Sequence, residues 1–102
     1  MPSQLEVDFN EAMLDIYCRA KTEANYNAIP FLQMIADLGG TETAHVLINA
    51  PTVSEGYTEL WARKRLDLTV ESMVTRNPRF HELFTEEELD ICRNRLHEYG
   101  QG

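Results

Sequence analysis

The chain has 102 residues, 43% hydrophobic and 25% charged, with 17 acidic against 9 basic residues and a net charge of −8. This length holds one domain with one core, and no apolar run approaches the roughly 20 residues that a membrane span needs. Near the N-terminus, no basic region precedes an apolar segment, so we expect no secretory signal there.

The first predicted helix runs from about Gln4 to Thr22. Its apolar face repeats at helical spacing and consists of Leu5, Phe9, Ala12, Met13, Ile16, Tyr17 and Ala20. Asp8, Glu11 and Asp15 form an acidic stripe well away from that face. This pattern predicts one buried side and one charged side.

Two short helices are expected next. Asn27 is a plausible N-cap for the second, with Pro30 in its first turn, and its buried stripe is Phe31, Met34, Ile35 and Leu38. Gly39-Gly40 ends it, because glycine adopts the left-handed cap conformation without a Cβ penalty. Thr41 is the expected N-cap of the third helix, which Pro51 ends by about Asn49.

The fourth predicted helix has Ser54 as its N-cap and carries Tyr57, Leu60 and Trp61. We expect Trp61 in the core rather than as an exposed stacking platform. Its last turn is Arg63-Lys64-Arg65, where cations complement the negative end of the helix dipole.

Asp67 or Thr69 is expected to begin a fifth helix with Val70, Met73 and Val74 inward, and Asn77-Pro78 opens a sixth of one or two turns. Thr85 and Glu88 form a capping box, in which each side chain bonds the other residue's amide. The last helix has a buried stripe of Leu89, Cys92, Leu96 and Tyr99 and ends at Gly100.

All the apolar patterns are helical, so residues 1–102 are predicted to form a single all-α domain. Six to seven short helices suit a compact orthogonal array better than a long four-helix bundle. The first and last helices are the longest, and we expect them to pack together as its frame.

No motif of catalytic, cofactor-binding or metal-ligating residues is found. His45, His81 and His97 lack the spacing of metal ligands, and each is expected to be structural or to lie at the surface. Cys18 and Cys92 give no disulfide framework, so we expect passive, reduced thiols in a cytoplasmic protein. These observations predict a protein that is not an enzyme and has no cofactor.

The negative charge is uneven. Residues 1–62 hold nine acids and two bases, whereas residues 63–102 hold eight acids and seven bases. Affinity for phosphate backbones comes largely from Lys and Arg, so nucleic acid is an unlikely partner. Arg63, Lys64 and Arg65 are the only basic cluster, and with nearby Trp61 they suit a phosphate or an acidic partner, or simply form a solvated helix end.

Several runs resemble a family of small bacterial helical domains, found alone or as an accessory segment of larger proteins, some of them similar to nucleases of restriction or defence systems. The most specific are Ser54-Glu55-Gly56-Tyr57-Thr58-Glu59-Leu60-Trp61 and Arg65-Leu66-Asp67-Leu68-Thr69-Val70-Glu71. The resemblance covers roughly residues 14–100. It implies the helical fold and assigns no catalytic residue.

From the residues themselves, the run from Arg65 to Glu71 is interpreted as structural. Leu66, Leu68 and Val70 would be core, Asp67 would cap the next helix, and Arg65 would pair with Glu71 or another acid. A buried ion pair of this kind helps to fix a unique packing.

The leading functional prediction is a non-catalytic module that binds another protein, with unknown oligomeric state. The possible partner-binding residues are Asp8, Glu11, Asp15, Arg63, Lys64 and Arg65. One alternative is an acidic decoy that imitates nucleic acid and inhibits a DNA-handling enzyme. Another is an accessory DNA-associated element that uses the basic cluster.

Overall fold

The computed structural model describes residues 2–100, and no strand is present among them, which confirms the predicted all-α class. Its helices, with η marking the 3-10 helices, are α1 (Gln4–Glu23), α2 (Ile29–Leu38), α3 (Gly40–Asn49), α4 (Glu55–Ala62), η1 (Leu66–Leu68), α5 (Val70–Arg76), η2 (Pro78–Leu83) and α6 (Glu86–Glu98).

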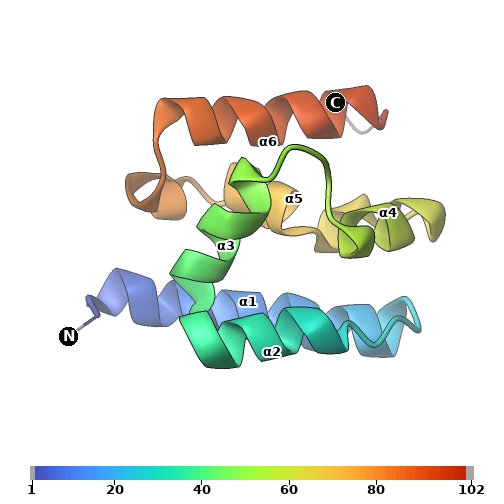
Figure 1. The fold of residues 1–102 in the computed structure, drawn as a ribbon, viewed down its shortest axis with the longest axis horizontal. Coiled ribbons are helices and arrows are strands. Elements are labelled where there is room, and N and C mark those ends of the chain that lie inside the picture. The colour runs from blue at the N-terminus through green and yellow to red at the C-terminus, as the bar shows by residue number, and fades with distance from the viewer. Residues whose placement is uncertain (1, 101–102) are drawn as a thin grey trace.

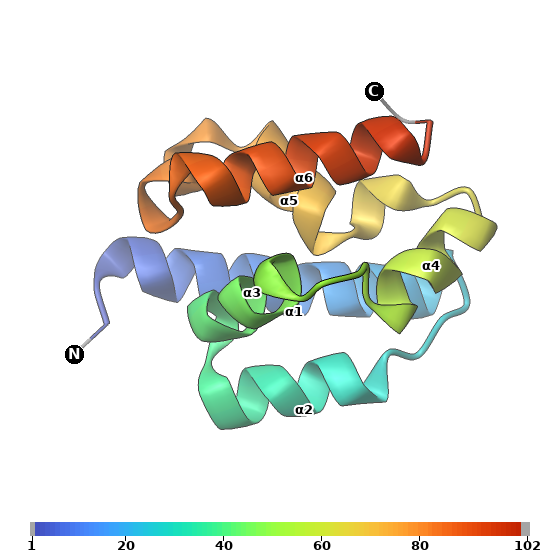
Figure 2. The ribbon, with the colours of Figure 1, turned by 45° about the horizontal axis from the view of Figure 1, so that its top comes forward.

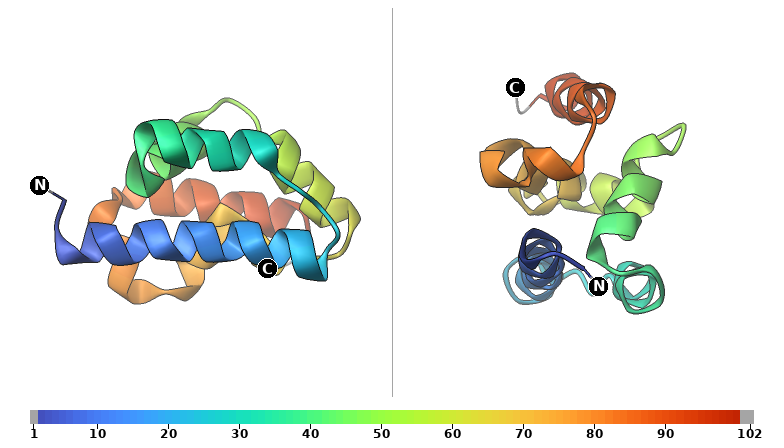
Figure 3. Two further views of the ribbon diagram at one scale, coloured as in Figure 1. Left: turned by 90° about the horizontal axis from the view of Figure 1, so that it is seen from below. Right: turned by 90° about the vertical axis from the view of Figure 1, so that its left-hand side faces the viewer.

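The helices stack in three levels (Figure 1). α1 and α2 lie side by side at the bottom, α6 lies at the top, and α3 and α5 lie between them, as the end-on view of Figure 3 also shows. The longest helices are α1, with 20 residues, and α6, with 13. The prediction that the first and last helices pack against each other is wrong. α1 packs mainly on α2 and α3, whereas α6 packs mainly on α5 and α3.

The main core joins all three levels of the fold. Phe9 of α1 is fully buried, and its ring meets those of Phe80 and Phe84 edge-on, with centroids 5.1 Å and 5.5 Å away. Edge-to-face pairs add to the stability gained from burial alone. The other buried members of this cluster are Met13, Ile16, Ile35, Ala44, Ile48, Val70, Met73, Val74, Leu89 and Cys92.

The Gly39-Gly40 turn shows why two glycines are needed between α2 and α3. Gly39 has φ of +83°, where a side chain would be strained. A Cβ on Gly40 would lie 2.8 Å from the Asn10 Cα, so only glycine allows α3 this close to α1. Asn10 Oδ1 accepts a hydrogen bond of 2.8 Å from the Gly40 amide. The prediction of Thr41 as N-cap is wrong, because Thr41 lies inside α3, which follows Gly39 without a side-chain cap.

The predicted helix starts divide into two groups. Ser54, Thr69 and Thr85 each accept a hydrogen bond from an amide of the first turn, and Thr85 and Glu88 form the full capping box. Asn27 is not an N-cap, because its side-chain oxygen accepts a hydrogen bond from the Tyr17 hydroxyl at 2.7 Å. α2 begins without a side-chain cap.

Four expectations around α2, α4 and η1 are wrong. Trp61 is 46% exposed and Leu38 is 47% exposed, so neither belongs to the core. α4 ends at Ala62 because Lys64 adopts a left-handed conformation with φ of +61°, which places the basic cluster beyond the helix. Asp67 lies inside η1 and Thr69 caps α5 instead.

Candidate functional site

A surface patch lies where the end of α4 meets the end of α6 (Figure 2). It consists of Trp61, Arg63, Lys64 and Tyr99 and is called the Trp61 patch below. The Trp61 ring packs edge-on against Tyr99 with centroids 5.4 Å apart, and Tyr99 in turn packs on buried Tyr57 at 5.0 Å. This chain of rings holds the exposed indole in place. Arg63 and Lys64 are both exposed beside it.

The three predicted bases differ in their surroundings. Arg65 bonds Glu23 at 2.7 Å and Asp67 at 3.0 Å, and Arg63, directly after α4, pairs with Glu59 of that helix. The hydrogen bonds that Arg19 and Arg65 donate lower the pKa of Glu23 to about 2. Only Lys64 of the three makes no ion pair within residues 2–100. The structure therefore does not bring them together as one free basic cluster.

The three predicted acids line a shallow groove between α1 and the α5–η2 segment. Arg19, Arg76 and Arg79 line the same groove, together with Asp67. Asp8 accepts hydrogen bonds from Gln4 at 2.8 Å and Arg79 at 2.5 Å, and these bonds lower the pKa of its carboxyl. Within residues 2–100, Asp8 is the one member of the acidic stripe that forms an ion pair, with Arg79, whereas Glu11 and Asp15 only share the groove with arginines.

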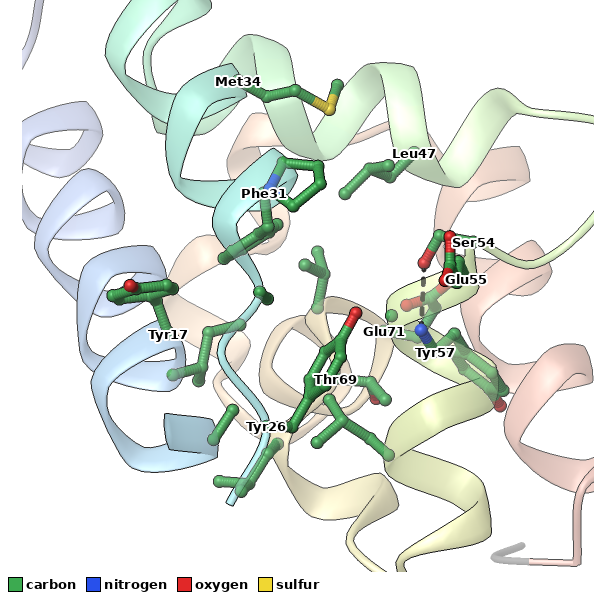
Figure 4. Close-up of a pocket in the computed structure, with 18 residues that line it drawn as sticks. Tyr17, Tyr26, Phe31, Met34, Leu47, Ser54, Glu55, Tyr57, Thr69 and Glu71 are labelled. Atoms are coloured by element: carbon green, nitrogen blue, oxygen red, sulfur yellow. Dashed lines mark hydrogen bonds between the residues drawn. The ribbon is translucent and has the colours of Figure 1, made fainter. Parts of the chain in front are cut away.

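A cavity of about 250 Å³, partly open to solvent, lies among α1, α2 and α4, and α3 and the η1–α5 segment form its other walls (Figure 4). Its apolar walls include Ile16, Phe31, Met34, Leu47, Leu60 and Leu68. Tyr26 projects its hydroxyl into this space, whereas Tyr57 directs its hydroxyl away from it. Sequence analysis did not predict the cavity, because its walls come from six separate elements.

One wall of the cavity contains the most deeply buried ion pair within residues 2–100. Glu71, 4% exposed, accepts a hydrogen bond of 3.0 Å from Arg95, 8% exposed. Arg95 also donates to the carbonyls of Leu47, Ala50 and Thr52 at 3.1, 2.7 and 3.4 Å. Burial raises the pKa of Glu71 despite these contacts. Of the two alternatives expected for Arg65, the pair with Glu71 is wrong and a pair with another acid is confirmed, because Arg65 bonds Asp67 and Glu23. Glu71 instead pairs with Arg95, 24 positions later.

A second polar contact joins α3 to the capping box of α6. Glu88 Oε2 lies 2.5 Å from His45 Nδ1 and accepts a bond of 2.7 Å from Asn49. Burial acts to raise the pKa of Glu88, but the bonds from the Thr85 amide, His45 and Asn49 outweigh it, so the net pKa is lowered. His45 therefore has a structural contact that its sequence context did not identify.

The thiols and the potential metal ligands give no sign of a reactive centre. Cys18 is exposed and Cys92 is buried, and both are free. Burial raises the pKa of Cys92 to about 12, which disfavours the reactive thiolate. Within residues 2–100, His, Cys, Asp and Glu nowhere gather in groups of three or more that suit a metal ion.

No helix within residues 2–100 combines the length and the apolar character needed to cross a membrane. Comparisons with known protein families, with curated proteins and with solved structures found no match. The resemblance noted from the sequence therefore stays a prediction, and the function is argued from this chain alone.

Proposed function

We propose that this chain is a non-catalytic, cytoplasmic helical module that binds another protein through the Trp61 patch. The observation that carries the proposal is the 46% exposure of Trp61, the largest apolar side chain in the protein, held in place by Tyr99. Trp, Tyr and Arg are the residues that most often dominate the energy of protein interfaces. An indole already fixed in place loses little freedom on binding.

The charges around the patch suggest the chemistry of the partner. Lys64 has no acidic neighbour in an ion pair within residues 2–100, whereas the surrounding protein is acidic. We therefore expect a partner with an apolar pocket for Trp61 and at least one carboxylate near Lys64. The two free thiols support the cytoplasmic assignment, since unpaired cysteines are typical of reducing compartments.

The two alternative functions receive less support. A decoy of nucleic acid needs an uncompensated row of negative charge, but Asp8, Glu11 and Asp15 share their groove with three arginines. An accessory DNA element needs free cations, but Arg63 and Arg65 are already paired with acids.

The test uses variants matched for exposure. Wild type, Trp61→Ala and Val46→Ala would each be immobilised and incubated with extract of the native host. Val46 is 43% exposed and lies on α3, so it controls for general loss of apolar surface. We expect a partner that binds wild type and Val46→Ala alike, and binds Trp61→Ala at least about thirtyfold more weakly.

The melting temperatures of the three proteins would be measured in parallel. Truncating half-exposed Trp61 should leave the fold intact, so weaker capture reflects the surface and not unfolding. Equal capture by wild type and Trp61→Ala, or equal losses in both variants, would overturn the assignment to the Trp61 patch.

A further inference from the structure

We propose that the cavity among α1, α2 and α4 is a binding site for a neutral, mainly apolar small molecule of one or two aromatic rings. This inference is independent of the Trp61 patch, because the residues of that patch do not line the cavity. It rests on the size of the cavity, its polar groups and its charge.

The size of the cavity separates it from ordinary packing defects. Protein interiors contain few voids larger than a water molecule. An engineered apolar cavity of about 150 Å³ holds benzene, and drug-sized ligand sites start at about 300 Å³. At about 250 Å³, this cavity suits a ligand larger than benzene and smaller than a typical drug.

Most polar groups on the wall are already used within the protein. Ser54 Oγ accepts a bond of 3.1 Å from the Tyr57 amide, and Thr69 Oγ1 donates to the Leu66 carbonyl at 2.7 Å. The Tyr17 hydroxyl donates to Asn27. The Tyr26 hydroxyl, by contrast, projects into the cavity (Figure 4). It is thus the group placed to give a ligand one hydrogen bond.

The charges select against ionised ligands. Glu71 lies in one wall, where Arg95 balances it, and Glu55 lies at the exposed rim. A carboxylate ligand would be repelled by Glu55 and would lose its hydration among apolar side chains. A cation would be attracted by these acids, but it would lose its hydration among apolar side chains and lie near the Arg95 guanidinium that bonds Glu71. A neutral ligand avoids both penalties.

Gly56 provides a way to fill the cavity without removing any core side chain. A Cβ built on Gly56 would lie 3.7 Å from the Tyr26 hydroxyl oxygen, an ordinary contact distance, so the side chain of a substituted residue would point into the cavity. In the variant Gly56→Phe a phenyl ring would occupy the ligand space. Thr58→Phe is the matched control, because Thr58 is exposed on the same helix and does not line the cavity.

The experiment is a titration of the full chain with 2-naphthol, followed by two-dimensional amide NMR spectra. We expect saturable shifts at the amides of Ala28, Phe31 and Leu68 in wild type and in Thr58→Phe, and none in Gly56→Phe. The melting temperature should rise with 2-naphthol in the first two proteins, since a ligand of the folded state stabilises it. A melting curve of Gly56→Phe without ligand would verify that this variant is folded.

Two further arms test the chemistry of the ligand. 2-Naphthoate, which has the same rings and a carboxylate, should bind at least tenfold more weakly than 2-naphthol. Tyr26→Phe should weaken the binding of 2-naphthol by about two- to tenfold, the usual net effect of one hydrogen bond. The same variant should bind naphthalene as tightly as wild type does.

Three results would overturn the proposal. The first is the absence of saturable shifts in wild type up to the solubility limit of 2-naphthol. The second is unchanged binding in Gly56→Phe, and the third is a shift pattern centred on the Trp61 indole. Equal binding of 2-naphthoate would overturn the assignment of a neutral ligand.

Discussion

Glu71 and Arg95 form an ion pair whose two side chains are 5% and 10% exposed. Removing two charges from water is expensive, and their attraction repays this only when the remaining hydrogen-bonding positions are also filled. Arg95 meets that condition through three backbone carbonyls around the end of α3. The pair therefore ties α5, α6 and the α3–α4 loop into one unit.

The first prediction at the residue scale concerns this pair. Glu71→Ala should lower the free energy of unfolding by about 3–5 kcal/mol, because it leaves the Arg95 guanidinium buried without an acid. Glu71→Gln should lower the free energy of unfolding less, since its amide oxygen still accepts a hydrogen bond from Arg95 and the desolvated charge of Glu71 is gone. Urea denaturation of both variants would measure the difference.

Glu82→Ala is the control for this measurement. Glu82 is exposed in η2 and makes no ion pair within residues 2–100, so its loss should change stability by less than about 0.5 kcal/mol. A loss in Glu71→Ala as small as in Glu82→Ala would contradict the role given to the pair.

This pair marks a limit of sequence analysis at the residue scale. The run from Arg65 to Glu71 suggested an ion pair, but the nearer acids Asp67 and Glu23 bind Arg65, and Glu71 faces away toward α6. Arg95 lies next to the apolar stripe of Cys92 and Leu96, a position that hints at burial. Its partner depends on how separate helices pack, which the sequence pattern does not specify.

At the scale of single helices, local side-chain chemistry explains most of the starts. α1 and α6 both begin with a complete capping box, Ser3 with Glu6 and Thr85 with Glu88. The box on α6 is also tied to α3, because Glu88 bonds both His45 and Asn49. The box on α1 has no such contact and lies in an exposed first turn.

The second prediction compares these two boxes. Thr85→Ala should destabilise the protein by about 1 kcal/mol, the usual effect of losing an N-cap, and lower the melting temperature by about 4–8 °C. Ser3→Ala removes the same motif from the start of α1. Local opening of this exposed turn disturbs few core contacts, so the loss of stability should be smaller. Thermal melts followed by circular dichroism would measure both, and equal effects would contradict the argument.

The helix boundaries show where the sequence was sufficient and where it was not. Ser54, Thr69 and Thr85 were predicted as caps because a hydroxyl three residues before a free amide is a local signal. The prediction for Asn27 was wrong because its side chain bonds Tyr17 instead. The prediction for Thr41 was wrong because α3 begins one residue earlier, at Gly40, whose amide bonds Asn10 of α1. The prediction of a buried Trp61 was wrong because helical spacing places Trp61 beside Leu60 but does not determine how much of α4 other helices cover.

At the scale of the whole molecule, the net charge is −8, and within residues 2–100 few cations remain without an acidic partner. Arg19, Arg63, Arg65, Arg79, Arg93 and Arg95 all form ion pairs with acids of this chain. A phosphate backbone gains affinity in proportion to the cations that neutralise it, and each of these would first have to leave an acid. The net negative charge and the pairing of arginines with acids therefore both disfavour binding to nucleic acid.

The last prediction follows from this distribution. The Kd for duplex or single-stranded DNA should be above about 10⁻⁴ M at physiological salt, which is an affinity weaker than that of usual non-specific binding. The variant with Arg63, Lys64 and Arg65 all changed to alanine should behave like wild type, because only Lys64 is free to meet a phosphate. Gel shifts at about 50 mM and about 200 mM salt would measure this, since true phosphate contacts weaken steeply over that range. Micromolar binding that disappears in the triple variant would favour the accessory DNA function over the protein-binding module, because the ion pairs of Arg63 and Arg65 would then have to exchange their acids for phosphate.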